Sequence, residues 1–256
     1  LEEVLELAEE KGVVVREAMT ISHMPLYKKL KERIKEGAIG NTKMVQVNFG
    51  SNKGYDSTQR FFALEAAGGA LLDIGVYATA FARTFLSEMP NTILTTVEYL
   101  ETGADEQSGI IMKNTKGEMV VMCLTLRAKQ PKRGVVTGDK GYIEVYEYPR
   151  ACKATITNTA TGEVETVEAG KTEDALKYEV EAMEAAIEGN LEDDCQIITK
   201  DTMRILTSIK TQWGMKYPFI RIYQKEMCQT HISFFTGRSF CYQLYLIRMK
   251  QEGAVR

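Results

Sequence analysis

One apolar segment of the sequence carries two residues that could take part in acid/base chemistry. Residues 67–86 read AGGALLDIGVYATAFARTFL, and within them Asp73 and Tyr77 are four positions apart. On a helix this spacing places both side chains on one face. The preceding pair, Gly68 and Gly69, would let the backbone enter the helix tightly or let a ligand come close. Carboxylates and phenols both act as proton-transfer groups in enzymes.

The same pair also has a purely structural interpretation. An acid in the first turn of a helix is stabilised by the helix dipole, and a Tyr beside it can be half-buried. On an arbitrary helix this would be the usual arrangement. The two residues alone therefore leave both interpretations open.

Other chemical motifs are missing from the sequence. It contains no G-x-G-x-x-G, no G-x-x-x-x-G-K-[ST] and no G-x-S-x-G, which are the motifs of dinucleotide sites, P-loops and nucleophile elbows. The two histidines, His23 and His231, have no Cys/His cluster around them. We therefore expect no metal site.

The composition is that of an ordinary globular protein, with 44% hydrophobic and 26% charged residues in 256. The net charge of -3 argues against a nucleic-acid partner, because such binding relies on neutralising phosphates. The five cysteines have no C-x-x-C spacing, which is typical of reduced thiols in the cytoplasm. No apolar run reaches the roughly 18 residues of a membrane span. We expect a cytoplasmic protein without a membrane partner.

The N-terminal residues predict the end of an α/β domain. An amphipathic helix over 1–11 is followed at 13–15 by the run VVV, which is typical of a buried parallel strand. We expect residues 1–19 to be a remnant of a Rossmann-type dinucleotide-binding domain whose earlier part is not in this sequence.

Residues 20–218 predict an α+β substrate-binding and oligomerisation domain. A strand at 43–49 and seven further strand-like segments between 91 and 169 predict a large, mostly antiparallel sheet with turn residues between its strands. Predicted helices at 25–37, 172–189 and 197–214 would cover one face of this sheet.

Residues 219–256 differ from the rest in composition. They are rich in aromatic and basic residues, and they keep neither a helical nor an alternating period. We interpret them as an atypical tail that the fold does not need, the alternative being an extension that binds a partner.

Several segments together resemble one enzyme family. The segment 67–86 resembles the substrate-domain motif G-G-x-x-x-D-x-G-x-H of the Gfo/Idh/MocA oxidoreductases, with Tyr77 at the last position as in the branch of glucose–fructose oxidoreductase and dihydrodiol dehydrogenase. The segments at 17–50, 136–145 and 178–189 are similar to other family segments: EAMTISHMPLYKKLKERIKEGAIGNTKMVQVNFG, VTGDKGYIEV and YEVEAMEAAIEG.

The resemblance implies an NAD(P)-dependent oxidoreductase that acts on sugars or cyclic alcohols. Tyr77 corresponds to the general acid/base and Asp73 to its companion acid. Gly68 and Gly69 are expected near the substrate, and Glu17 near the NAD or NADP. Removing a hydride from a secondary alcohol also releases the hydroxyl proton, which a group in hydrogen-bond reach must accept.

Two parts of the family pattern are absent or altered. A phenol, with an ordinary pKa of about 10, needs a cationic neighbour to work near neutrality. In the family this neighbour is the Lys of an E-K-P motif, which this sequence lacks. Where related members often read E-A-M-W-T-R-F-x-P, this chain reads EAMTISHMP. His23 therefore either faces the cofactor or the substrate and alters selectivity, or has no chemical role, and both possibilities stay open.

Two functions follow from these expectations. The first is the substrate domain of an NAD(P)-dependent oxidoreductase for a sugar-like molecule, forming a homodimer or higher homo-oligomer through the sheet. The alternative is a non-catalytic, truncated relative that serves as a binding or dimerisation module.

Overall fold

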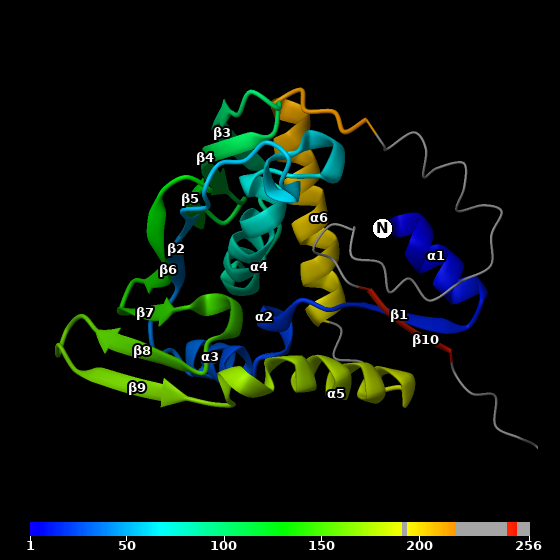
Figure 1. Ribbon diagram of the computed structural model, residues 1–256. Coiled ribbons are helices and arrows are strands. Elements are labelled where there is room, and N and C mark those ends of the chain that lie inside the picture. Colours follow the sequence, from blue (N-terminus) through cyan, green and yellow to red (C-terminus); the bar gives the residue numbers. More distant parts are fainter. Residues whose placement is uncertain (191–193, 219–244, 250–256) are drawn as a thin grey trace, which may run out of the picture.

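The fold is built on one large sheet with helices on one of its faces. The structure, a computed structural model, describes residues 1–190, 194–218 and 245–249. Its 8-stranded sheet has the order β3-β4-β5-β2-β6-β7-β8-β9. In Figure 1 the sheet lies on the left and the long helices lie on its right-hand side. The predicted α+β fold is confirmed.

The sheet is antiparallel except for one pair of neighbours. Only β2 and β5 run parallel among its strands, because helix α4 and two strands separate them along the chain. The strands are β2 (Thr42–Ser51), β3 (Thr92–Tyr99), β4 (Asp105–Lys113), β5 (Met119–Thr125), β6 (Lys129–Gly138), β7 (Gly141–Tyr146), β8 (Lys153–Asn158) and β9 (Val164–Glu168).

Helix α4 covers the inner face of the sheet and is packed between the sheet and α6, whereas α1 lies beside β1, away from the sheet (Figure 1). The described helices are α1 (Glu2–Glu10), α2 (Thr20–His23), α3 (Pro25–Lys35), α4 (Val76–Phe85), α5 (Ala175–Ile187) and α6 (Asp194–Gln212). Short helical turns are η1 (Arg60–Phe62), η2 (Leu64–Ala66), η3 (Leu71–Gly75), η4 (Tyr148–Arg150) and η5 (Thr172–Asp174).

Alternating side chains explain why these segments form a half-covered sheet. In β7, Ile143 and Val145 are fully buried, whereas Tyr142 and Glu144, which alternate with them, point to the other face. Helix α4 approaches the inner face closely because β6 has Gly134 there. A Cβ at that position would lie 2.2 Å from Cζ of Phe81.

The segment that contains α4 has an unusually apolar composition. Leu64–Phe85 is long and apolar enough to cross a membrane, but 72% of its most apolar window is buried inside the protein. A core helix has the same properties, and α4 occupies that place.

Strand β1 (Val13–Glu17) corrects one expectation. It pairs with β10 (Tyr245–Met249) in an antiparallel register, from Val13 opposite Met249 to Glu17 opposite Tyr245. The prediction of a parallel strand at 13–15 is wrong, because a run of β-branched residues indicates a buried strand without specifying its partner's direction. The other tail residues, 219–244 and 250–256, lie outside the described residues. That the tail is dispensable stays a prediction.

Candidate functional site

Asp73 and Tyr77 lie one turn apart at the start of the central helix. Asp73 is in η3, a π-helical turn, and η3 continues directly into α4, where Tyr77 is the second residue. Single π-helical turns occur frequently at functional sites. Both residues lie in one continuous helical segment, as the sequence predicted, and its first turn is wider than an α-helix would have.

The Asp73 carboxylate is buried between two cations. Its side chain is only 6% exposed, and its oxygens lie 2.8 Å from Nζ of Lys53 and 3.4 Å from Nη2 of Arg60. A buried carboxylate is tolerated only with such partners. Both cations come from residues 52–66, so these ion pairs connect that segment to the helix. The Asp73 carboxylate is therefore stabilised by two ion pairs, and not by the dipole of the helix alone.

Gly68 and Gly69 have structural reasons to be glycine. A Cβ on Gly68 would lie within 2.8 Å of the carbonyl oxygens of Arg60, Phe61 and Ala63. Gly69 has a φ of 118°, and a Cβ there would lie 1.9 Å from Oδ1 of Asp105. The tight entry into the helix that the sequence indicated is present. Their predicted place beside the substrate stays a prediction.

Asp105 is a residue of this site that the sequence did not reveal. It begins β4, is fully buried, and accepts a hydrogen bond of 2.6 Å from the backbone N–H of Leu71. Burial raises the pKa of Asp105 to about 7. Hydrogen bonds from backbone N–H groups, including those at the start of the helix, lower the pKa but do not offset the effect of burial. No local pattern indicates this contact, because its two residues are 34 positions apart.

We expect Asp105→Asn to change how stability depends on pH. Because the pKa of Asp105 is about 7 in the fold and about 4 in the unfolded chain, the folded protein binds more protons between these values. Stability should therefore fall as pH rises through that range. The variant lacks this titration, so its stability relative to wild type should rise by up to a few kcal/mol from low to neutral pH. Urea unfolding at several pH values measures the difference; a difference that does not change with pH would contradict the expectation.

Glu17 and His23 lie together in a different part of the molecule. The Glu17 carboxylate accepts a 2.5 Å hydrogen bond from the Thr199 hydroxyl, and Nε2 of His23 lies 3.2 Å from the Glu17 carbonyl oxygen. Burial lowers the pKa of His23, so its imidazole is neutral near pH 7. A small cavity of about 20 Å³ lies beside both residues, also lined by Arg16 and Cys195. Their predicted contacts with cofactor and substrate stay predictions.

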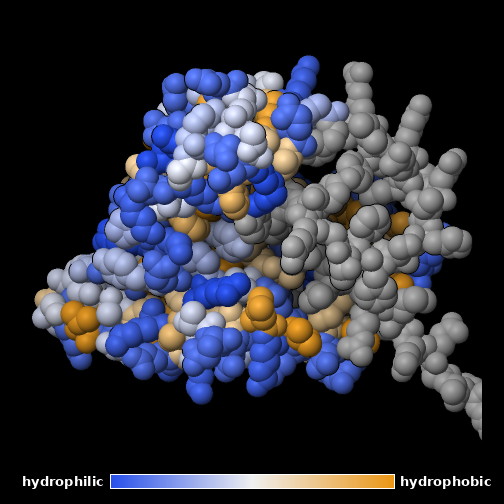
Figure 2. Space-filling view, viewed as in Figure 1, coloured by the Kyte–Doolittle hydropathy of each residue, from blue (hydrophilic) through white to orange (hydrophobic). Residues whose placement is uncertain are grey.

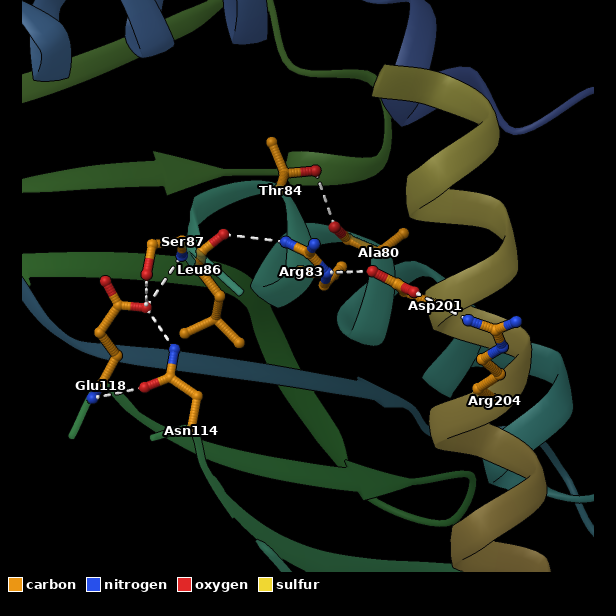
Figure 3. Close-up of polar contacts among 9 residues, drawn as sticks. All are labelled: Ala80, Arg83, Thr84, Leu86, Ser87, Asn114, Glu118, Asp201 and Arg204. Carbon is orange, nitrogen blue, oxygen red and sulfur yellow. Dashed lines mark hydrogen bonds and ion pairs between the residues drawn. The ribbon is translucent and has the colours of Figure 1, made fainter. Parts of the chain in front are cut away.

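The far end of α4 is fixed by polar contacts, shown in Figure 3. Arg83 donates to Asp201 of α6 at 2.7 Å and to the carbonyl oxygen of Leu86 at 2.9 Å. Beyond the helix, Glu118 accepts hydrogen bonds from the Ser87 backbone and hydroxyl at 2.8 and 2.9 Å. With Asp105 at its start and these contacts at its end, α4 holds Tyr77 in a defined position. In the part of the chain that the structure describes, no group of His, Cys, Asp or Glu could hold a metal ion.

The chain is similar to known oxidoreductases. Residues 27–144 match a family model described as GFO/IDH/MocA C-terminal domain. The trans-1,2-dihydrobenzene-1,2-diol dehydrogenase of Xenopus tropicalis is 29% identical over 57% of this chain and 44% of that protein. The scyllo-inositol 2-dehydrogenase (NADP(+)) IolU of Bacillus subtilis is 25% identical over 85% of this chain and 67% of that protein.

Solved structures share the fold. KijD10, a 3-ketoreductase from Actinomadura kijaniata in complex with NADP and TDP-benzene, has a TM-score of 0.70 at 16% identity, over 82% of this chain and 66% of that one. An aldose-aldose oxidoreductase from Caulobacter crescentus has a TM-score of 0.64 at 17% identity, over 77% and 61%. In the trans-1,2-dihydrobenzene-1,2-diol dehydrogenases of the two Xenopus species, the region that matches this chain spans less than half of the protein's length.

Proposed function

We propose that the chain, whose residues 27–144 match the family model described as GFO/IDH/MocA C-terminal domain, is the substrate domain of a nicotinamide-dependent oxidoreductase of this family. The substrate is a sugar or a cyclic alcohol. The relatives named as dehydrogenases of a cyclic diol and of an inositol support this substrate class. The activity is that of the full-length protein.

The observation that carries the proposal is the Asp73–Tyr77 pair at the start of α4. Tyr77 takes the hydroxyl proton of the alcohol, and NAD or NADP, when bound, would supply the acceptor for the hydride. Asp73 orients the substrate hydroxyl beside Tyr77. Asp73 is itself held by Lys53 at 2.8 Å and Arg60 at 3.4 Å, so its oxygens have fixed directions.

The chain has two cations in contact with Asp73, the residue one helical turn before Tyr77. A phenol that accepts a proton needs positive charge nearby, and the sequence indicated no such neighbour. Lys53 and Arg60 both contact Asp73. We propose that they provide part of this positive charge.

The residues present fit the reacting end of a nicotinamide cofactor better than its pyrophosphate. Pyrophosphate binding uses a glycine-rich turn at a helix N-terminus, and the sequence has no G-x-G-x-x-G. We propose that residues outside this sequence bind the pyrophosphate, and that residues 1–256 alone do not turn over substrate. The missing motif is also what favours the second candidate, a non-catalytic binding or dimerisation module.

An activity assay separates the two candidates. The full-length protein, purified without tags, is incubated with NAD or NADP and either scyllo-inositol or trans-1,2-dihydrobenzene-1,2-diol. Formation of reduced nicotinamide is followed by absorbance. Turnover that depends on Tyr77 supports the oxidoreductase. Binding of a polyol without turnover by either cofactor would favour the module.

We further propose that a second copy of this chain covers the outer face of the sheet. The register places Leu94 of β3 opposite Ile111 of β4, and Ile111 opposite Val121 of β5. Leu94 is 62% and Ile111 42% exposed, so an apolar row crosses three strands on the face without helices. Contiguous exposed apolar surface of this kind is typical of an interface.

We expect Leu94→Lys combined with Ile111→Lys to weaken self-association by about tenfold or more, because each burial is worth roughly 1.5–3 kcal/mol. Sedimentation velocity over a range of concentrations measures it. The matched control is Leu176→Lys. Leu176 lies on α5, away from the outer face of the sheet, and is 57% exposed. Hydrophobic surface is visible in the lower part of the molecule in Figure 2. A wild-type protein that is monomeric at micromolar concentration would contradict the proposal.

A further inference from the structure

The carboxyl group of Asp105 fits into a space that the backbone of the helix start leaves open. Its Oδ2 accepts a hydrogen bond of 2.6 Å from the N–H of Leu71. Its Oδ1 packs against Gly69, where a Cβ would lie only 1.9 Å away. The carbonyl oxygen of Gly69 in turn accepts a hydrogen bond of 3.1 Å from the N–H of Asp73. Asp105 is therefore connected to the backbone of Asp73 through Gly69 alone.

The charge of Asp73 also affects the titration of Asp105. Burial is the main cause of the raised pKa of Asp105, and the negative charge of Asp73 raises it further, because like charges disfavour each other's ionised forms. The two carboxyl groups therefore interact, and Asp105 lies beside the residue whose backbone it supports.

The residue after Asp105 is linked to Lys53 by two backbone hydrogen bonds. The carbonyl oxygen of Glu106 accepts from the N–H of Leu126 at 3.0 Å, and the carbonyl oxygen of Leu126 accepts from the N–H of Lys53 at 2.6 Å. Nζ of Lys53 then lies 2.8 Å from Oδ2 of Asp73. The start of β4 thus holds both partners of this ion pair. The Asp105 side chain holds the helix of the acid, and the backbone of the next residue holds the chain that carries the lysine.

The loop between β3 and β4 fixes the place where Asp105 begins its strand. The N–H of Leu100 donates to the carbonyl oxygen of Ala104 at 2.8 Å, which closes the loop. The hydroxyl of Thr102 donates to the carbonyl oxygen of Phe62, so the loop is also bound to the segment that precedes the helix. Asp105 is therefore supported from its own strand and loop as well as from the helix start.

We propose that Asp105 is a positioning residue for the Lys53–Asp73 ion pair and, through this pair, for the substrate that Asp73 orients. Its effect on the reaction rests on the proposed function, whereas its effect on the ion pair does not. A displacement of about 1 Å at a group that orients a substrate can cost about 100-fold in rate. A shift of the helix start would change the directions of the Asp73 oxygens in this way.

A double-mutant cycle in the full-length protein tests the effect on the ion pair. Urea unfolding of Lys53→Met, Asp73→Asn and the combined variant gives the coupling between these side chains, first in the wild-type background and then in Asp105→Ala. We expect the coupling to fall to about half or less. If Asp105→Ala does not fold, Thr102→Val, a milder change in the same loop, should lower the coupling as well. Unchanged coupling in the background that folds would overturn the proposal.

Steady-state kinetics test the link to the reaction. Asp105→Ala should lower kcat/KM by about tenfold or more. Asp105→Asn keeps an oxygen that can accept the Leu71 hydrogen bond, so its kcat/KM should stay within about threefold of wild type. Because Asp105 acts through Asp73, Asp105→Ala should add little to the loss in Asp73→Asn, whereas independent effects would add. Fully additive losses would overturn the link to the reaction.

Asp139 provides a matched control at the other end of β2 from Lys53. It accepts a hydrogen bond of 2.9 Å from the N–H of Asn41, and a Cβ on Gly40 would lie 1.9 Å from its Oδ1, so its contacts resemble those of Asp105. Asp139→Ala should leave both the coupling and kcat/KM unchanged, and losses equal to those of Asp105→Ala would contradict the assignment. Reduced coupling in Asp105→Ala without turnover of any substrate by the wild type would refute the proposed function and support the positioning of the ion pair.

Discussion

Tyr77→Phe is expected to lower kcat of the full-length protein by about 10²–10⁴-fold, the usual contribution of a general acid/base group. The change keeps the ring, which packs against the core from the first turn of α4, and removes only the hydroxyl. Affinity for the nicotinamide cofactor should stay nearly unchanged. Steady-state kinetics with the best substrate measures the effect.

The control for Tyr77→Phe is its unfolding curve. A purely structural Tyr would lose about 1 kcal/mol of stability through a missing hydrogen bond, and turnover would stay intact. We expect the reverse, with a small change in stability and a large loss of turnover. Wild-type kcat in this variant would remove Tyr77 from the mechanism, and His23 would be the next residue to replace.

Asp73→Asn is expected to lower both stability and activity. The variant leaves Lys53 and Arg60 without their carboxylate at a side chain that is 6% exposed. Removing one partner of such a buried pair costs about 3 kcal/mol. If Asp73 orients the substrate, kcat should fall and KM should rise.

A second ion pair, which is more exposed to solvent, separates the effect of burial on stability from the effect of removing a charge. Glu144→Gln removes the carboxylate that Arg133 contacts at 2.5 Å, but those side chains are 23% and 37% exposed. Its cost should stay under about 1 kcal/mol, as for surface pairs. Urea unfolding of both variants gives the comparison. Equal costs for the two would show that Asp73 is not held as the structure indicates.

The sheet and the Asp73–Tyr77 pair could be predicted because both depend on local patterns. Alternation of apolar residues indicated β7 and β2, and the four-residue spacing placed the pair on one helix face. The π-helical turn was not predictable, since its wider geometry depends on packing. A Cβ on Gly75 would lie 2.7 Å from Leu124 of β5, so the turn is shaped by a strand far away in sequence.

The polar partners of the site could not be predicted for the same reason. Lys53 and Asp73 are 20 positions apart, and Asp105 and Leu71 are 34 apart. Nothing in either local sequence indicates that these groups meet. The sequence therefore predicted the residue pair that could transfer a proton, but not the cations beside it or the carboxylate that caps its helix.

The most direct test of the proposed mechanism is a crystal structure of the full-length protein with a nicotinamide cofactor and an alcohol substrate bound. We predict the Tyr77 hydroxyl within about 2.6–3.2 Å of the reacting hydroxyl, the range a proton-transfer group requires, with Asp73 still between Lys53 and Arg60. A substrate whose reacting hydroxyl is bound by another side chain, with Tyr77 turned away from it, would contradict the mechanism.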